Sequence, residues 1–105
     1  MTHSVFIGAG RVLVPHDTYA LYLGGVDSAA LIERDAQVLL LPLRGPVAGG
    51  MLLKQRNLRG DRVMLATDFL SQLGLDPFAV EAEFKVQWVA GAGALLIQGL
   101  TANRA

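Results

Sequence analysis

The feature that most constrains the fold is the stretch at residues 80–88, where apolar and polar side chains alternate strictly. The apolar set is Val80, Ala82, Phe84, Val86 and Trp88, separated by Glu81, Glu83, Lys85 and Gln87. Successive side chains of a strand point to opposite faces, so this pattern predicts a half-buried β-strand. The small residues at 90–93 predict a turn. Together with the apolar run at 94–98, they make the region a predicted hairpin.

A similar hairpin is predicted earlier, from the apolar runs at 29–33 and 36–41 around Arg34 and Asp35. Pro42 keeps the second run from continuing as a central strand, because proline lacks the N–H that a ladder needs. A short helix is predicted before each hairpin, at 18–23 and at 69–73. Their candidate N-caps and stops are Asp17 and Gly24 for the first, and Thr67 or Asp68 and Gly74 for the second.

The order strand, strand, helix, strand, strand therefore occurs twice, because short strands are also predicted at 5–7, 11–14, 51–56 and 62–65. Arg11, Val12 and Asp17 recur 51 positions later as Arg62, Val63 and Asp68. We predict a single domain, 1–105, that is mainly β with two short helices and is built from a duplicated strand-strand-helix-strand-strand unit. The units span roughly 4–43 and 51–100, and the glycine- and proline-rich segment 44–50 links them.

Apolar side chains on these elements supply the predicted core. Its members are Phe6, Val12, Val14, Leu21, Leu31, Leu39, Leu41, Leu53, Val63, Leu65, Leu70, Leu73, Phe84, Val86, Trp88, Leu95 and Ile97.

Composition narrows the class of protein. The chain has 52% hydrophobic and 17% charged residues, no net charge and no cysteine, which excludes disulfides and thiolate metal sites. It has no signal-peptide pattern and no apolar run long enough for a membrane span, so we expect a cytoplasmic protein that does not enter a membrane. So much apolar surface in a small domain favours a homo-oligomer, with the uncharged strand edges 38–41 and 94–97 covered by another copy.

A resemblance to a known family rests on residues 10–15, which read GRVLVP, followed by a short helix, Leu23, Gly24 and Asp27. This resembles the swapped-hairpin domain of AbrB-like transcriptional regulators and antitoxins. The second unit keeps Gly60, Arg62 and Leu65 but has Ala66 in place of the proline, and two such units in one chain resemble the MraZ-type regulators. The resemblance implies a small swapped-hairpin barrel, a DNA-binding function, and positions for Arg11 and Arg62 near DNA.

The positively charged residues cluster in the middle of the chain, where residues 44–62 carry a net charge of +4. Arginine grips phosphate oxygens and releases counterions on binding DNA, so this cluster predicts a nucleic-acid site. The candidate contacts are Arg11, Arg44, Lys54, Arg56, Arg59 and Arg62. Two alternatives stay open: Lys54 and Arg56 as the charged outer face of an edge strand, and Arg11 and Arg62 as partners of acids such as Asp17 or Asp68.

Catalysis has little support in the sequence. The two histidines, His3 and His16, have no further ligands at a spacing that suits a metal site. Glu81 and Glu83 share a strand face with Lys85 and Gln87, which indicates a solvent-exposed face rather than a catalytic carboxylate pair. We therefore predict no enzyme, no metal and no cofactor. The predicted function is a small DNA-binding transcriptional regulator or antitoxin-like protein. The alternative is a non-catalytic interaction or assembly protein that forms a homo-oligomer and has a protein partner.

Overall fold

The computed structural model describes residues 3–45 and 50–102. It contains nine short strands and two short helices in these ranges. In chain order these are β1 (Ser4–Gly8), β2 (Arg11–Val14), α1 (His16–Tyr22), β3 (Ser28–Arg34), β4 (Gln37–Leu43), β5 (Met51–Leu52), β6 (Lys54–Gln55), β7 (Arg62–Leu65), α2 (Thr67–Gln72), β8 (Ala82–Val89) and β9 (Ala94–Ile97). The predicted mainly β domain with two helices is therefore confirmed.

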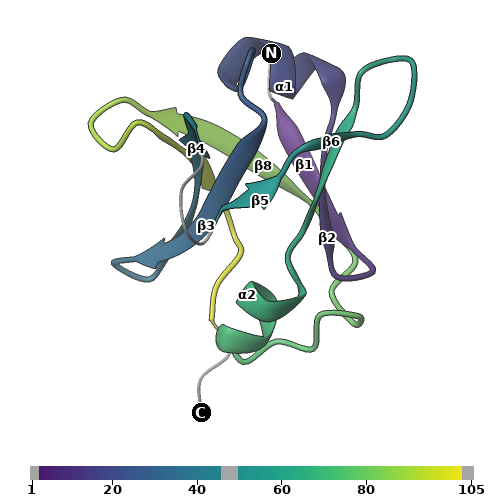
Figure 1. The fold of residues 1–105 in the computed structure, drawn as a ribbon. Coiled ribbons are helices and arrows are strands. Elements are labelled where there is room, and N and C mark those ends of the chain that lie inside the picture. Colours follow the sequence, from purple (N-terminus) through teal and green to yellow (C-terminus); the bar gives the residue numbers. More distant parts are fainter. Residues whose placement is uncertain (1–2, 46–49, 103–105) are drawn as a thin grey trace.

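One antiparallel sheet, in the order β5-β3-β4-β9-β8-β1-β2-β7-β6, bends round on itself (Figure 1). Its two end strands, β5 and β6, belong to the same short segment and are separated only by Leu53. β5 pairs with β3 and β6 pairs with β7, so this segment joins the two ends of the sheet. The Leu53 N–H donates to the Asp27 carbonyl at 2.8 Å and its side chain is buried. The result is a nearly closed barrel.

The pairing also connects the two halves of the chain. β1 pairs with β8 and β5 pairs with β3, so the first strand of each half lies beside the strand that follows the helix of the other half. β2 pairs with β7, and β4 pairs with β9. That the halves are copies of one unit stays a prediction, and the linker at 44–50 lies partly outside the described residues.

Two strand edges that we expected a second copy to cover are internal. Val38 pairs with Ile97, Leu39 with Leu96 and Leu40 with Leu95, so β4 and β9 satisfy one another within the chain. The expectation that these edges are open was wrong, because the barrel closes within the chain. A homo-oligomer would therefore have to form through a surface other than these two strand edges.

The helices lie at opposite ends of the barrel (Figure 1). Tyr19 and Thr18 of α1 and Leu70 of α2 are buried, which closes the two ends of the core. Neither helix has a side-chain N-cap: α1 begins after Pro15 and α2 after Ala66, and Asp17, Thr67 and Asp68 lie inside the first turns. The predicted caps were therefore wrong by one or two residues. Among the described residues, no helix has the length and hydrophobicity to span a membrane.

Strand faces differ from the prediction in two places. In β1, Val5 and Ile7 are fully buried while Phe6 points outward, and in β7 Met64 is buried while Leu65 is 53% exposed. Leu21 of α1 and Trp88 of β8, which were also predicted in the core, are 59% and 37% exposed. Placing Phe6, Val63 and Leu65 in the core was wrong by one position, and a shift of one residue turns every side chain of a strand to the other face.

Candidate interaction site

An apolar row crosses the outside of the barrel. Phe6 on β1 pairs with Leu13 on β2, and Leu13 pairs with Val63 on β7. Directly paired residues of antiparallel strands share a face. Their neighbours Val5, Ile7, Val12, Val14 and Met64 are buried, so the row faces out. Glu83 of β8 pairs with Phe6 at one end, and Lys54 of β6 pairs with Val63 at the other.

Leu65 lies two residues beyond Val63 on the same face of β7, and it pairs with Arg11 of β2. We call Phe6, Leu13, Val63 and Leu65 the outer patch. The Phe6 ring lies over Gly8, where a Cβ would be only 2.7 Å from the ring carbon Cε1. The absence of a side chain at Gly8 therefore lets an aromatic ring lie flat on the outside of the sheet while remaining 37% exposed.

A groove of about 530 Å³ adjoins the outer patch. Its lining is Arg11, Gly50, Met51, Leu52, Lys54, Val63, Met64 and Leu65. Five of these side chains are apolar, two are cationic and none is acidic. The cations lie on either side of β7, since β7 pairs with β2, which carries Arg11, and with β6, which carries Lys54. Within residues 3–45 and 50–102, the side chains of Arg11 and Lys54 make no hydrogen bond or ion pair.

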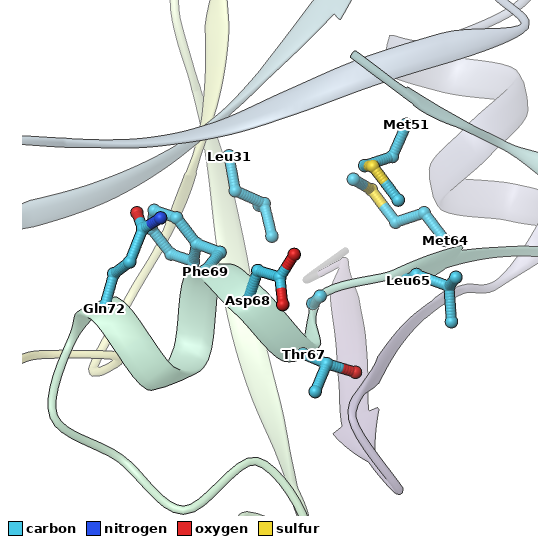
Figure 2. Close-up of a pocket in the computed structure, with 9 residues that line it drawn as sticks. Leu31, Met51, Met64, Leu65, Thr67, Asp68, Phe69 and Gln72 are labelled. Atoms are coloured by element: carbon cyan, nitrogen blue, oxygen red, sulfur yellow. The ribbon is translucent and has the colours of Figure 1, made fainter. Parts of the chain in front are cut away.

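A second hollow of about 450 Å³ shares Met51, Met64 and Leu65 with the groove. Figure 2 shows the two methionine side chains lying together, and the Asp68 carboxylate from α2 pointing into the space below Leu31. Leu65 and Thr67 point away from Leu31 in the same view. The two hollows together form a mainly apolar surface, to which the groove contributes two cations and the second hollow one carboxylate.

The loop that follows β6 is held by its own hydrogen bonds. Asn57 Oδ1 accepts the Gly60 and Asp61 N–H groups at 3.1 and 3.2 Å, and its Nδ2 donates to Asp61 Oδ2. Asp61 Oδ1 accepts the backbone N–H of His16 at 2.8 Å, which anchors the start of α1 to this loop. Leu58 at the tip of the loop is fully exposed. The loop therefore has a fixed base and an exposed apolar tip.

Asp61 also binds Arg59, whose Nη2 lies 3.0 Å from Oδ2. The hydrogen bonds from Asn57 and from the His16 N–H, with Arg59 beside them, lower the pKa of Asp61 to about 2, and desolvation opposes this shift. The carboxylate is therefore ionised at neutral pH. Arg59 remains mostly exposed beyond this contact.

Arg62 points inward, unlike the other predicted phosphate contacts. Its guanidinium lies 4.4 Å from the centroid of the Tyr19 ring, and its Nη1 is 3.5 Å from the Leu53 carbonyl. Its Nε is buried without a hydrogen-bond partner among the described residues. Stacking of this kind between a cation and an aromatic face stabilises the packing of α1 on the barrel.

The six predicted contacts are thus only partly brought together. Arg11 and Lys54 line one groove, exposed Arg56 follows Lys54 two residues later, and Arg59 is tied to Asp61. Arg44 lines a different hollow together with Asp27. Leu52 lines both this hollow and the groove. No ion pair joins Arg11 or Arg62 to Asp17 or Asp68 in the part of the chain that the structure describes.

Sequence reasoning missed the outer patch because it assigned three of its members to the core. The signal that could have found it is the Arg-Val-Leu-Val pattern of β2: placing Arg11 outside also places Leu13 outside and Val12 inside. Among the described residues no cluster of three or more His, Cys, Asp or Glu could hold a metal. His3 packs edge-on against Tyr22, which stacks on Trp88.

Comparison with known proteins found no family model, no curated protein and no solved structure that matches this chain.

Proposed function

We propose that this protein is a non-catalytic interaction module that binds a protein partner through the outer patch. The observation that carries the proposal is the apolar row Phe6–Leu13–Val63 across three neighbouring strands, with Leu65 beside it. Antiparallel strands with one solvated face normally place polar residues there. Exposed contiguous apolar surface on a small domain marks an interaction site.

Site-specific photo-cross-linking in producing cells tests this function. A photo-reactive phenylalanine analogue at position 6 or 65 should give protein adducts that mass spectrometry identifies. Leu21 on α1 is the matched control, because it is 59% exposed, close to the 53% of Leu65, but lies on another element. Adducts from positions 6 and 65 and not from 21 support the proposal. Equal adduct yields from all three, or none at all, would show that the patch is not a protein-binding surface.

DNA binding is the second candidate, favoured by the three cations Arg11, Lys54 and Arg56, whose side chains have no ion pair among the described residues. It also rests on the resemblance of residues 10–15 to swapped-hairpin regulators. In this candidate Arg56 and Lys54 contact phosphate, and Arg62 is left out because its guanidinium stacks on Tyr19.

Fluorescence anisotropy with a labelled DNA duplex at increasing salt tests the second candidate. Each of Lys54→Ala and Arg56→Ala should reduce the salt slope by about 1 if the residue neutralises one phosphate. Arg34→Ala is the matched control, an exposed arginine at the far end of β3. A wild-type chain that fails to bind at low salt, or a slope that Arg34→Ala changes as much, would exclude the DNA reading.

A further inference from the structure

We infer that the groove beside the outer patch binds an acidic-apolar segment of a partner protein, in which a carboxylate side chain is next to leucine-like residues. This inference rests on the proposed function and specifies the partner's chemistry. It is carried by a groove with an apolar lining of Met51, Leu52, Val63, Met64 and Leu65, and with two cations, Arg11 and Lys54, that have no ion pair among the described residues.

Charge complementarity selects the acidic group. A carboxylate placed over β7, between Arg11 on β2 and Lys54 on β6, would meet two cations and no acid among the residues that line the groove. Arginine also offers a planar fork that matches a carboxylate. A basic partner would instead be repelled by both cations.

The apolar floor selects leucine-like neighbours for that carboxylate. Met51, Leu52 and Leu65 are 38%, 61% and 53% exposed, so a partner's aliphatic side chains would remove this surface from water. Methionine side chains adapt to irregular shapes, and the exposed Met51 lies beside the buried Met64 (Figure 2). A DNA backbone would use the cations but leave this floor exposed.

Asp68 adds one acid beside this surface. It lines the second hollow, which shares Met51, Met64 and Leu65 with the groove. Arg11 also lies near the start of α2, because it pairs with Leu65 and the Gly10 carbonyl accepts the Ala66 N–H. A second acid of the partner that enters the second hollow would be repelled by Asp68, so a segment with a single acid is favoured.

Methionine methyl groups report on this site directly. The chain has three methionines, and two of them, Met51 and Met64, line both hollows. The whole chain, with isotope-labelled methionine methyl groups, is titrated to millimolar concentration with a synthetic peptide that has one glutamate followed by leucines. Matched peptides carry glutamine or lysine in place of the glutamate. Both methyl signals should shift, and binding should be strongest for the glutamate peptide.

Variants then test the charges. Lys54→Gln or Arg11→Gln should weaken binding of the glutamate peptide about two- to five-fold, as expected for one exposed charge pair, and leave the glutamine peptide unchanged. Arg34→Gln, remote on β3, should change neither. Added salt should weaken the glutamate peptide alone. Asp68→Asn should improve binding of a peptide that carries a second acid.

Three results would overturn the inference: equal affinity for glutamate and lysine peptides, no methyl shift at millimolar peptide, or shifts with sodium octanoate but not with the peptide. The last would identify a small amphiphilic anion as the ligand. If cross-linking from positions 6 and 65 still yields partner adducts, the proposed function stands and only the acidic-apolar specificity fails. If those adducts are missing as well, both fail.

Discussion

The neighbouring residues Met64 and Leu65 test the strand face on which both proposals depend. Met64 is 2% exposed and points into the barrel, and Leu65 is 53% exposed and points out. Truncating a buried methionine to alanine costs about 2–5 kcal/mol. Because Met64 borders the groove, solvent can enter the vacated space, and we expect Met64→Ala to cost about 3 kcal/mol. Leu65→Ala should cost about 1 kcal/mol, half the transfer free energy of a fully buried leucine.

These free energies convert to melting temperatures through the entropy of unfolding. At about 2.1 cal/mol/K per residue, the 105-residue chain has an unfolding entropy of about 0.22 kcal/mol/K. Met64→Ala should therefore lower Tm by about 14 °C, and Leu65→Ala by about 5 °C. Thermal unfolding followed by circular dichroism at low micromolar concentration, with urea unfolding as a second measure, gives both values. A larger loss for Leu65→Ala than for Met64→Ala would refute the outward placement of the patch and, with it, the groove.

Three further predictions concern the rest of the chain. The pKa of Asp61 in the folded protein lies below the ordinary value of 3.8, so the stability lost in Asp61→Asn should be greatest above pH 3.8 and should shrink as the pH falls towards about 2. Urea midpoints of the wild type and the variant across this range measure the loss. A difference between the two midpoints that does not change with pH would contradict the lowered pKa. Tyr19→Phe leaves the ring in place but removes the hydroxyl that donates to a buried carbonyl at 2.9 Å, so it should cost about 1–3 kcal/mol in urea unfolding, and no measurable cost would show that this bond is not formed. Gly60→Ala should lower Tm, because Gly60 has a φ of +98° and a Cβ there would lie 2.7 Å from His16 Nδ1. Gly91→Ala is the control and should leave Tm almost unchanged, because a Cβ at position 91 would have no atom within 4 Å. Equal changes of Tm in the two variants would contradict the steric explanation.

Local patterns predicted most of the elements. The alternation at 80–88 predicted β8, but its inward face only in part: Val86 is buried and Phe84 is half-buried, whereas Ala82 and Trp88 are exposed. Gly74 follows α2 as predicted, with a φ of +79° and an N–H that donates to the Ser71 carbonyl, whereas after α1 the positive φ lies at Gly25 rather than at the predicted Gly24. These features depend on neighbours within a few positions, which a sequence displays directly.

The candidate site was predicted only in part. The positive charge of residues 44–62 is evident in the sequence, and Lys54 does line the groove. The sequence could not show that the Arg62 guanidinium stacks on the Tyr19 ring. Nor could it show that Arg11 and Lys54 lie on either side of β7 and line the same groove. β1 and β7 are short and almost uniformly apolar, so they lack the polar alternation that would have assigned their faces. The outer patch was therefore placed inside.

The sequence by itself determined the class of fold, because strand alternation, helix stops and turn residues are local and agree with one another along the chain. Only the tertiary structure decided which apolar residues remain in contact with water. The register of β2 against β7, and of β1 against β2, places Phe6, Leu13 and Val63 in one row on the outside. The crossing of the segment around Leu53, from β3 to β7, then forms the groove with Arg11 and Lys54. Both arise from contacts between residues far apart in the chain, whose energy depends on which faces meet rather than on local pattern.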